Sequence, residues 1–211
     1  MQSVGVTPNF ITYSVLLDGL CKNRRVNEAL SLFRIIINNG IHPNVALYTV
    51  LIDGCCKNGK LGIALDLFSE LCSRGLQPNI VTYNAMINGL CNEGLIEEAK
   101  ELVMKMEKNS VFPNNVTYNI ILQGILKGKK LKDALLHMKE MDARGFSVDA
   151  SSFYLLLESI PAEEQDSNFA DLIIKLVPQD ILKSKFKPVG CWDVAGMCRL
   201  ALDDYPIMAK S

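Results

Sequence analysis

The sequence has few of the residues on which catalysis and metal binding usually depend. Its 211 residues include two histidines and one tryptophan. Neither His42 nor His137 lies in an HxE or HExxH pattern, and Cys191 and Cys198 lack the spacing of metal ligands. The phosphate-binding pattern GxxxxGK[ST] and the nucleophile pattern GxSxG are missing too. We therefore expect no catalytic residues, no metal and no cofactor, and no small-molecule substrate.

An excess of charge of one sign and long apolar runs are also missing. The formal net charge is −1 and the isoelectric point is near 6.1, without the overall basic character of many nucleic-acid-binding proteins. No run of about 18 uncharged apolar residues occurs, which argues against a membrane span. Residues 1–9 have neither an arginine-rich nor an apolar leader, so no targeting peptide is visible. Seven cysteines, an odd number without secretory context, are expected as free thiols.

The sequence does contain an internal repeat of 35 residues. Four kinds of residue recur in one register: the pairs Pro8-Asn9, Pro43-Asn44, Pro78-Asn79 and Pro113-Asn114; then Tyr13, Tyr48, Tyr83 and Tyr118; Gly19, Gly54, Gly89 and Gly124; and Ala29, Ala64, Ala99 and Ala134. Val148-Asp149 and Phe153 continue the step. Four residue types in one register identify a repeat protein, whose units must stack to cover their apolar faces.

Each unit is predicted to form two helices. The third unit shows the pattern most clearly, with a first apolar stripe of helical period at Tyr83, Met86, Ile87, Leu90 and Cys91. Gly94 interrupts it, and a second stripe follows at Ile96, Ala99, Leu102, Val103 and Met106. The threonines after the linkers (Thr12, Thr82 and Thr117) are predicted to cap the first helices. The recurring alanines are expected where the two helices of a unit cross, and the recurring Cys21, Cys56 and Cys91 in the core, because Leu126 replaces cysteine in the fourth unit.

These patterns predict an all-α protein, a right-handed α-solenoid of helix–turn–helix repeats with a C-terminal helical cap. The predicted boundaries are 1–9, the end of a truncated repeat; 10–44, 45–79, 80–114 and 115–149, four repeats; 150–177, a degenerate repeat or capping helix pair; and 178–211, an irregular tail. Because the chain starts in the middle of a unit, we expect a fragment or a truncated gene product. One short helix is predicted near residues 192–202.

The sequence resembles the pentatricopeptide repeat family. The carriers of the resemblance are the period of 35, the Pro-Asn closing pairs and the run from Val81 to Cys91, VTYNAMINGLC. The tetratricopeptide repeat, with its period of about 34 and a Trp-x2-Leu-Gly signature, fits less well. The constant unit length resembles the P-type subclass, and the run RGFSVDAS at residues 144–151 resembles the closing repeats of plant fertility-restorer-like members.

The resemblance implies that the protein binds single-stranded RNA, one base per repeat. In that family the fifth and last residues of each unit read the base, which here are Ser14 with Asn44, Thr49 with Asn79, Asn84 with Asn114, and Asn119 with Asp149. By the family's code these pairs imply the tract 5′-A-A-C/U-U-3′. The second residues, Ile11, Ala46, Val81 and Val116, would flank the base, and Lys22, Lys57 and Lys127 would contact phosphates. The third unit has Asn92 at the lysine position, so a weak salt dependence is expected.

Two alternatives stand beside this interpretation. Asparagines near helix starts, Asn84 and Asn119 among them, often serve as caps, and lysines that end helices often complement the helix dipole. The whole array could instead be a protein-binding scaffold without RNA contact. The resemblance further implies a role in organellar RNA processing, stability or translation, in the mitochondrion or, as second choice, the chloroplast. Other RNA-processing proteins would then be partners, without enzyme activity in this chain.

Overall fold

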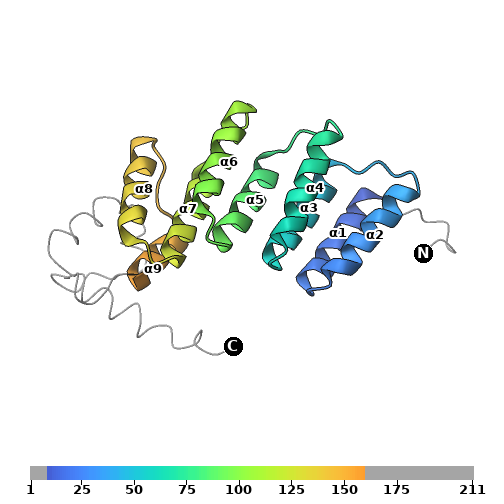
Figure 1. The fold of residues 1–211 in the computed structure, drawn as a ribbon, viewed down its shortest axis with the longest axis horizontal. Coiled ribbons are helices and arrows are strands. Elements are labelled where there is room, and N and C mark those ends of the chain that lie inside the picture. Colours follow the sequence, from blue (N-terminus) through green and yellow to red (C-terminus); the bar gives the residue numbers. More distant parts are fainter. Residues whose placement is uncertain (1–8, 160–211) are drawn as a thin grey trace. The chain divides into compact units, whose positions relative to one another are not determined.

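The computed structural model describes residues 9–159, and these form helices joined by short linkers (Figure 1). The first helix of each repeat, called its opening helix, is α1 (Phe10–Lys22), α3 (Val45–Lys57), α5 (Ile80–Asn92), α7 (Asn115–Lys127) or α9 (Ala150–Ser159). The second helix of a repeat, called its closing helix, is α2 (Val26–Asn38), α4 (Leu61–Ser73), α6 (Ile96–Lys108) or α8 (Leu131–Ala143). The opening helices start 35 residues apart, so the sequence period is also the structural period. The prediction of an all-α repeat solenoid is confirmed.

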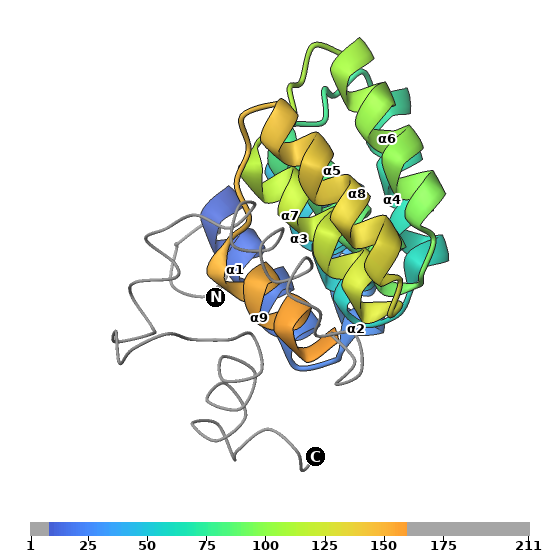
Figure 2. The same cartoon turned by 90° about the vertical axis from the view of Figure 1, so that its left-hand side faces the viewer.

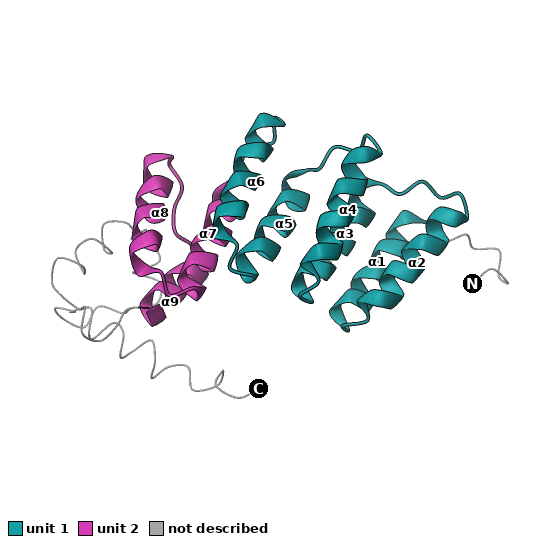
Figure 3. Ribbon diagram, in the orientation of Figure 1, with its two compact units in different colours: residues 1–113 teal, residues 114–211 magenta. Residues whose placement is uncertain are grey.

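The chain divides into two compact units, residues 1–113 and 114–211 (Figure 3). In the first unit, α3 packs between α1 and α5, and each of these helices also packs on the helix that follows it. In the second unit, α7 packs against both α8 and α9 (Figures 1 and 2). The opening helices thus form one continuous layer within the first unit. A residue that recurs at the same position of the repeat therefore recurs from helix to helix along this layer.

The core consists of the predicted apolar stripes. Tyr83, Met86, Ile87, Leu90 and Cys91 are all buried on α5. Ala29, Ala64, Ala99 and Ala134 are fully buried, and Leu126 and the recurring cysteines, Cys21, Cys56 and Cys91, are buried too. His137, which the sequence analysis treats as structural, is buried, and its Nε2 lies 3.1 Å from the backbone oxygen of Tyr118. The recurring alanines and cysteines of the repeat are therefore core residues.

Two glycines allow adjacent opening helices to approach closely. A Cβ built on Gly54 would lie 2.6 Å from the Cβ of Cys21, and one built on Gly89 would lie 2.9 Å from the Cβ of Cys56. Gly19 has the same register, but a Cβ there would meet nothing within 4 Å. In these two cases the glycine of one repeat therefore leaves room for the cysteine of the repeat before it.

The helix caps differ from the prediction. The caps are the asparagines of the Pro-Asn pairs, whose Oδ1 accepts a hydrogen bond from the N–H three residues later: Asn9 from Thr12 at 3.0 Å, Asn44 from Leu47 at 3.1 Å, Asn79 from Thr82 at 3.0 Å and Asn114 from Thr117 at 3.1 Å. The prediction of threonine caps was wrong because both residue types can cap, and the backbone turns helical only after the asparagine. Thr117 still contributes, since its Oγ1 accepts from the N–H of Asn114 and completes a capping box.

Part of the predicted C-terminal organisation lies outside the described residues. The cap predicted at 150–177 is described as far as α9, where Ser152, Phe153, Leu156 and Leu157 are buried. The rest of that segment, the tail at 178–211 with its predicted short helix, and residues 1–8 are not described. No described helix has the length and apolar character that a membrane crossing requires.

Candidate nucleic-acid interface

The predicted base-reading residues fall into two structural classes. The fifth residues, Ser14, Thr49, Asn84 and Asn119, lie in the second turn of the opening helices and are half-buried or, in Asn119, buried. The last residues, Asn44, Asn79, Asn114 and Asp149, stand at the N-termini of the next opening helices, where the side-chain oxygen is engaged as a cap. The alternative that Asn84 and Asn119 are themselves caps is excluded, since α5 and α7 are capped by Asn79 and Asn114.

In the second repeat, hydrogen bonds connect the two reading residues. The Oγ1 of Thr49 lies 2.7 Å from the Oγ1 of Thr82, which in turn lies 3.1 Å from the Oδ1 of Asn79. The Oγ1 of Thr49 also lies 2.8 Å from the backbone oxygen of Val45, which competes for its single proton. The Oδ1 of Asn79 accepts from Thr82, so its amide N–H groups are the part of that side chain left for a ligand. Thr82 was not predicted as part of this site, although its three-residue spacing from Asn79 was visible.

In the fourth repeat the reading residues touch directly. The backbone N–H of Asp149 donates to the Oδ1 of Asn119 at 2.9 Å, and the Nδ2 of Asn119 donates to the backbone oxygens of Asn115 and Ser147, both at 2.9 Å. Asn119 is 2% exposed. Its two amide protons are both used, and one lone pair of Oδ1 is left. The Oδ1 of Asp149 accepts from the N–H of Ser152 at 2.7 Å, which holds the carboxylate at the start of α9.

Ser14 and Asn84 lie at the same position of their helices, α1 and α5. The Oγ of Ser14 donates to the backbone oxygen of Phe10 at 2.9 Å, within its own helix. Asn84 is half-buried on α5. The structure thus links the reading residues of the second and fourth repeats by hydrogen bonds, whereas the hydroxyl of Ser14 bonds within its own helix.

The predicted base-flanking residues have apolar side chains that are exposed to solvent. Ile11, Val81 and Val116 are 73%, 59% and 55% exposed, and Ala46 is exposed as well. Each lies three residues before a reading residue, one helical turn away and on the same face. An apolar side chain left exposed beside a polar, half-buried one forms a surface that could contact the face of a planar ring while its polar neighbour meets the edge.

The predicted phosphate contacts lie in the last turns of α1, α3 and α7. All three lysines are exposed, but Lys22 and Lys57 are ion-paired: their Nζ atoms lie 2.6 Å from the Oδ2 atoms of Asp18 and Asp53. The hydrogen bond and charge of Asp18 raise the pKa of Lys22 above its ordinary value. These lysines also stand at helix C-termini, so the dipole interpretation applies to them as well. The acids at i−4 were visible in the sequence and were missed.

The buried neighbours Cys55 and Cys56 offer no reactive group at this surface. Burial is the main cause that raises the pKa of Cys56 to about 12 and that of Cys55 to about 11. Such thiols stay neutral near pH 7, and the thiolate is the form that attacks electrophiles or binds metals. Within residues 9–159, no group of three or more His, Cys, Asp or Glu side chains is arranged to hold a metal ion.

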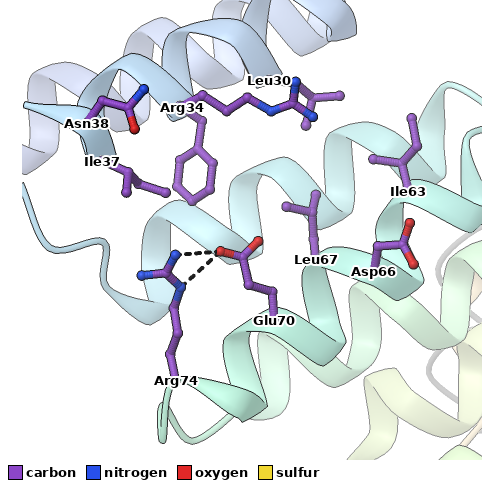
Figure 4. Close-up of a pocket in the computed structure, with 10 residues that line it drawn as sticks. Leu30, Arg34, Ile37, Asn38, Ile63, Asp66, Leu67, Glu70 and Arg74 are labelled. Atoms are coloured by element: carbon purple, nitrogen blue, oxygen red, sulfur yellow. Dashed lines mark hydrogen bonds and ion pairs between the residues drawn. The ribbon is translucent and has the colours of Figure 1, made fainter.

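A hollow lies between the closing helices α2 and α4 (Figure 4). It has a volume of about 480 Å³, with apolar walls from Leu30, Phe33, Ile37, Ile63 and Leu67. Glu70 lies on one side, where it accepts hydrogen bonds from the Tyr48 hydroxyl at 2.9 Å and from Arg74. Burial and this carboxylate raise the pKa of Tyr48 above its ordinary value. Glu70 on the closing helix α4 is therefore connected to Tyr48 on the opening helix α3.

Comparison with known families decides the classification. The profile described as PPR repeat family matches residues 8–57, 43–92 and 78–127, and the PPR repeat profile matches residues 116–146. The chain belongs to the pentatricopeptide repeat family. No curated protein matches it.

Solved structures of pentatricopeptide repeat proteins share the fold. The protein PPR10 in complex with an 18-nt psaJ RNA element is 24% identical, with a TM-score of 0.72; the match covers 88% of this chain and 27% of PPR10. The crystal structure of PPR10 from maize matches with a TM-score of 0.67 at the same identity and coverage. The PPR domain of Arabidopsis thaliana protein-only RNase P 1, in complex with tRNA, is 21% identical, with a TM-score of 0.63 and coverage of 89% of this chain and 95% of that domain. This pentatricopeptide repeat chain thus spans about a quarter of PPR10.

Proposed function

We propose that the chain binds single-stranded RNA with one base per repeat and performs no chemistry on it. The observation that carries the proposal is the recurring arrangement on α1, α3, α5 and α7: an exposed apolar residue one turn before a polar residue at the reading position. In two repeats this polar residue is hydrogen-bonded toward the last residue of its unit. Membership of the family, and relatives whose structures contain RNA, support the same assignment.

The proposed tract is 5′-A-A-C/U-U-3′, read by the four pairs in chain order. The last base has the clearest physical reason. Both amide protons of Asn119 are used inside the protein and this residue is 2% exposed, so the half-buried carboxylate of Asp149 is the group that the site presents to a base. An ionised carboxylate only accepts hydrogen bonds, and the Watson–Crick edge of uracil offers an N–H at the position where cytosine has an acceptor nitrogen. Uracil is therefore favoured.

A tract of four bases limits what this chain can select. At one base per repeat, four reading units specify a sequence that recurs about once in 256 nucleotides. We propose that the chain acts by occluding RNA or by recruiting RNA-processing proteins in organellar RNA processing, stability or translation. The proposed compartment is the mitochondrion, with the chloroplast second; both come from the family and not from a signal in this sequence.

Filter binding tests the proposal. A 12-nt RNA containing AACU is compared with a scrambled RNA of equal composition at several salt concentrations. We expect tighter binding of the AACU RNA, with a shallow salt dependence. Equal retention of both RNAs would contradict base reading, and absence of retention would contradict RNA binding.

Replacing Asp149 with asparagine should move the preference at the last base from uracil toward cytosine. Asparagine keeps the oxygen that caps α9 but adds an N–H donor, which the ring nitrogen of cytosine can accept. A hydrogen bond contributes about 1 kcal/mol, so the uracil-to-cytosine ratio of affinities should fall about fivefold. Gel shifts with all four bases at that position measure the ratio. An unchanged ratio in a variant that melts like the parent would show that Asp149 does not read the base.

A protein-binding scaffold is the second candidate function. The hollow between α2 and α4 favours it, since apolar walls with charged residues at the edge are typical of sites that receive a peptide side chain. If RNA is not retained on filters, while a partner protein protects Leu30 and Leu67 from amide hydrogen exchange, this second function replaces the first.

A further inference from the structure

Two ion pairs occupy the surface where RNA phosphates are proposed to bind. Lys22 is the last residue of α1 and pairs with Asp18, one turn earlier; Lys57 is the last residue of α3 and pairs with Asp53 in the same way. The Nζ–Oδ2 distance is 2.6 Å in both pairs. All four side chains line one hollow of about 240 Å³, together with Arg24 and Asn58. The two lysines contribute two positive charges and the two aspartates cancel them, so Arg24 is the remaining cation of this hollow.

The same register differs in the later repeats. The acid position is Asp18, Asp53, Asn88 and Gln123 along the chain, and the lysine position is Lys22, Lys57, Asn92 and Lys127. The first two repeats thus have an acid and a lysine, the third has two amides, and the fourth has a lysine without an acid four residues before it. The acid is an independent feature of each unit and does not simply accompany the lysine.

We propose that Asp18 and Asp53 set the strength of backbone binding by competing with RNA phosphates for Lys22 and Lys57. This inference rests on the proposed RNA-binding function. A phosphate oxygen can accept from the lysine Nζ only if it displaces the carboxylate or shares the ammonium group with it, and the carboxylate repels it meanwhile. The lysine side chains of the two pairs are 72% and 60% exposed to solvent, and exposed ion pairs are weak. RNA phosphates therefore displace the carboxylates from a fraction of the lysines.

The consequence concerns selectivity. Phosphate contacts are made with any sequence, whereas base contacts depend on sequence. Acids that weaken the phosphate contacts therefore lower the affinity for every RNA by the same factor. At a given protein concentration, such a chain leaves RNAs without the tract mostly unbound, whereas RNAs with the tract still bind.

The test compares the parent with D18N/D53N. We expect the variant to bind the AACU RNA and the scrambled RNA about fivefold more tightly at low salt. The slope of log K against log salt should steepen by about one, since each phosphate contact contributes about 0.7 for a single strand. The ratio of the two affinities should not change. D66N/E101Q serves as the control, because it changes the net charge equally at two exposed acids on α4 and α6. The control should gain less than about twofold.

A second pair of variants builds the same device in the third repeat. Asn92→Lys adds a lysine without an acid and should tighten binding, whereas N88D/N92K adds the complete pair and should return close to the parent affinity. If D18N/D53N gains no more than its control, or N88D/N92K binds as tightly as Asn92→Lys, the inference is wrong while RNA binding by the parent stands. If the parent binds no RNA, the proposed function and this inference both fall. Thermal melts of each variant verify that it is folded.

Discussion

Replacing Gly54 with alanine should lower the free energy of unfolding of the first unit by about 2 kcal/mol. The added methyl group would lie 2.6 Å from the Cβ of Cys21, far inside van der Waals contact, so α1 and α3 must separate. Both residues are buried, and neither helix can move without disturbing its own partner helix. Thermal unfolding followed by circular dichroism measures the effect, expected as a loss of about 5 °C or more.

Gly19→Ala is the matched control, because it makes the same change in the same register. A methyl group there would meet nothing within 4 Å, and alanine is the better helix former by about 1 kcal/mol. We therefore expect a neutral or slightly raised melting temperature for Gly19→Ala. If both variants melted alike, the close approach of α1 and α3 at Gly54 would be wrong.

The sequence predicted the repeat and its core because both depend on periodicity. A residue column such as Gly19, Gly54 and Gly89 is visible without coordinates, and so are apolar stripes of helical period. Periodicity alone could not show which of the recurring residues contact one another between helices. Gly54 faces Cys21, which comes 33 residues earlier, and this offset depends on how two helices are packed rather than on either helix alone.

The reading surface was less predictable, because its geometry depends on backbone atoms that leave no mark in the sequence. Asn84 and Asn119 have the same position in the repeat, yet Asn119 is buried through bonds to the backbone of residues 147 and 149 in the following linker. The choice between Asn79 and Thr82 as the cap of α5 similarly depended on where the backbone becomes helical. The Asp18–Lys22 pair, in contrast, has the i, i+4 spacing from which it could have been predicted.

Replacing Asn119 with alanine should lower the free energy of unfolding of the second unit by about 3 kcal/mol. The side chain makes three hydrogen bonds in a buried position, and its loss leaves the backbone oxygen of Ser147 and the N–H of Asp149 without their partners. Ser147 is exposed and Asp149 is half-buried, so water can replace these partners, and each lost hydrogen bond costs about 1 kcal/mol. Urea unfolding measures the total, and amide hydrogen exchange of Asp149, expected to accelerate, measures the local release of the linker.

Ser14→Ala is the comparison at the same repeat position, where the hydroxyl bonds to a backbone oxygen of its own helix. That change should stay within about 0.5 kcal/mol. If Asn119→Ala and Ser14→Ala were equally stable and the exchange of Asp149 were unchanged, Asn119 would not hold the linker. The expected difference has a functional meaning, because Asn119 fixes the backbone that presents Asp149. In the fourth repeat, the stability of the linker and the placement of the carboxylate proposed to select uracil therefore depend on one side chain, that of Asn119.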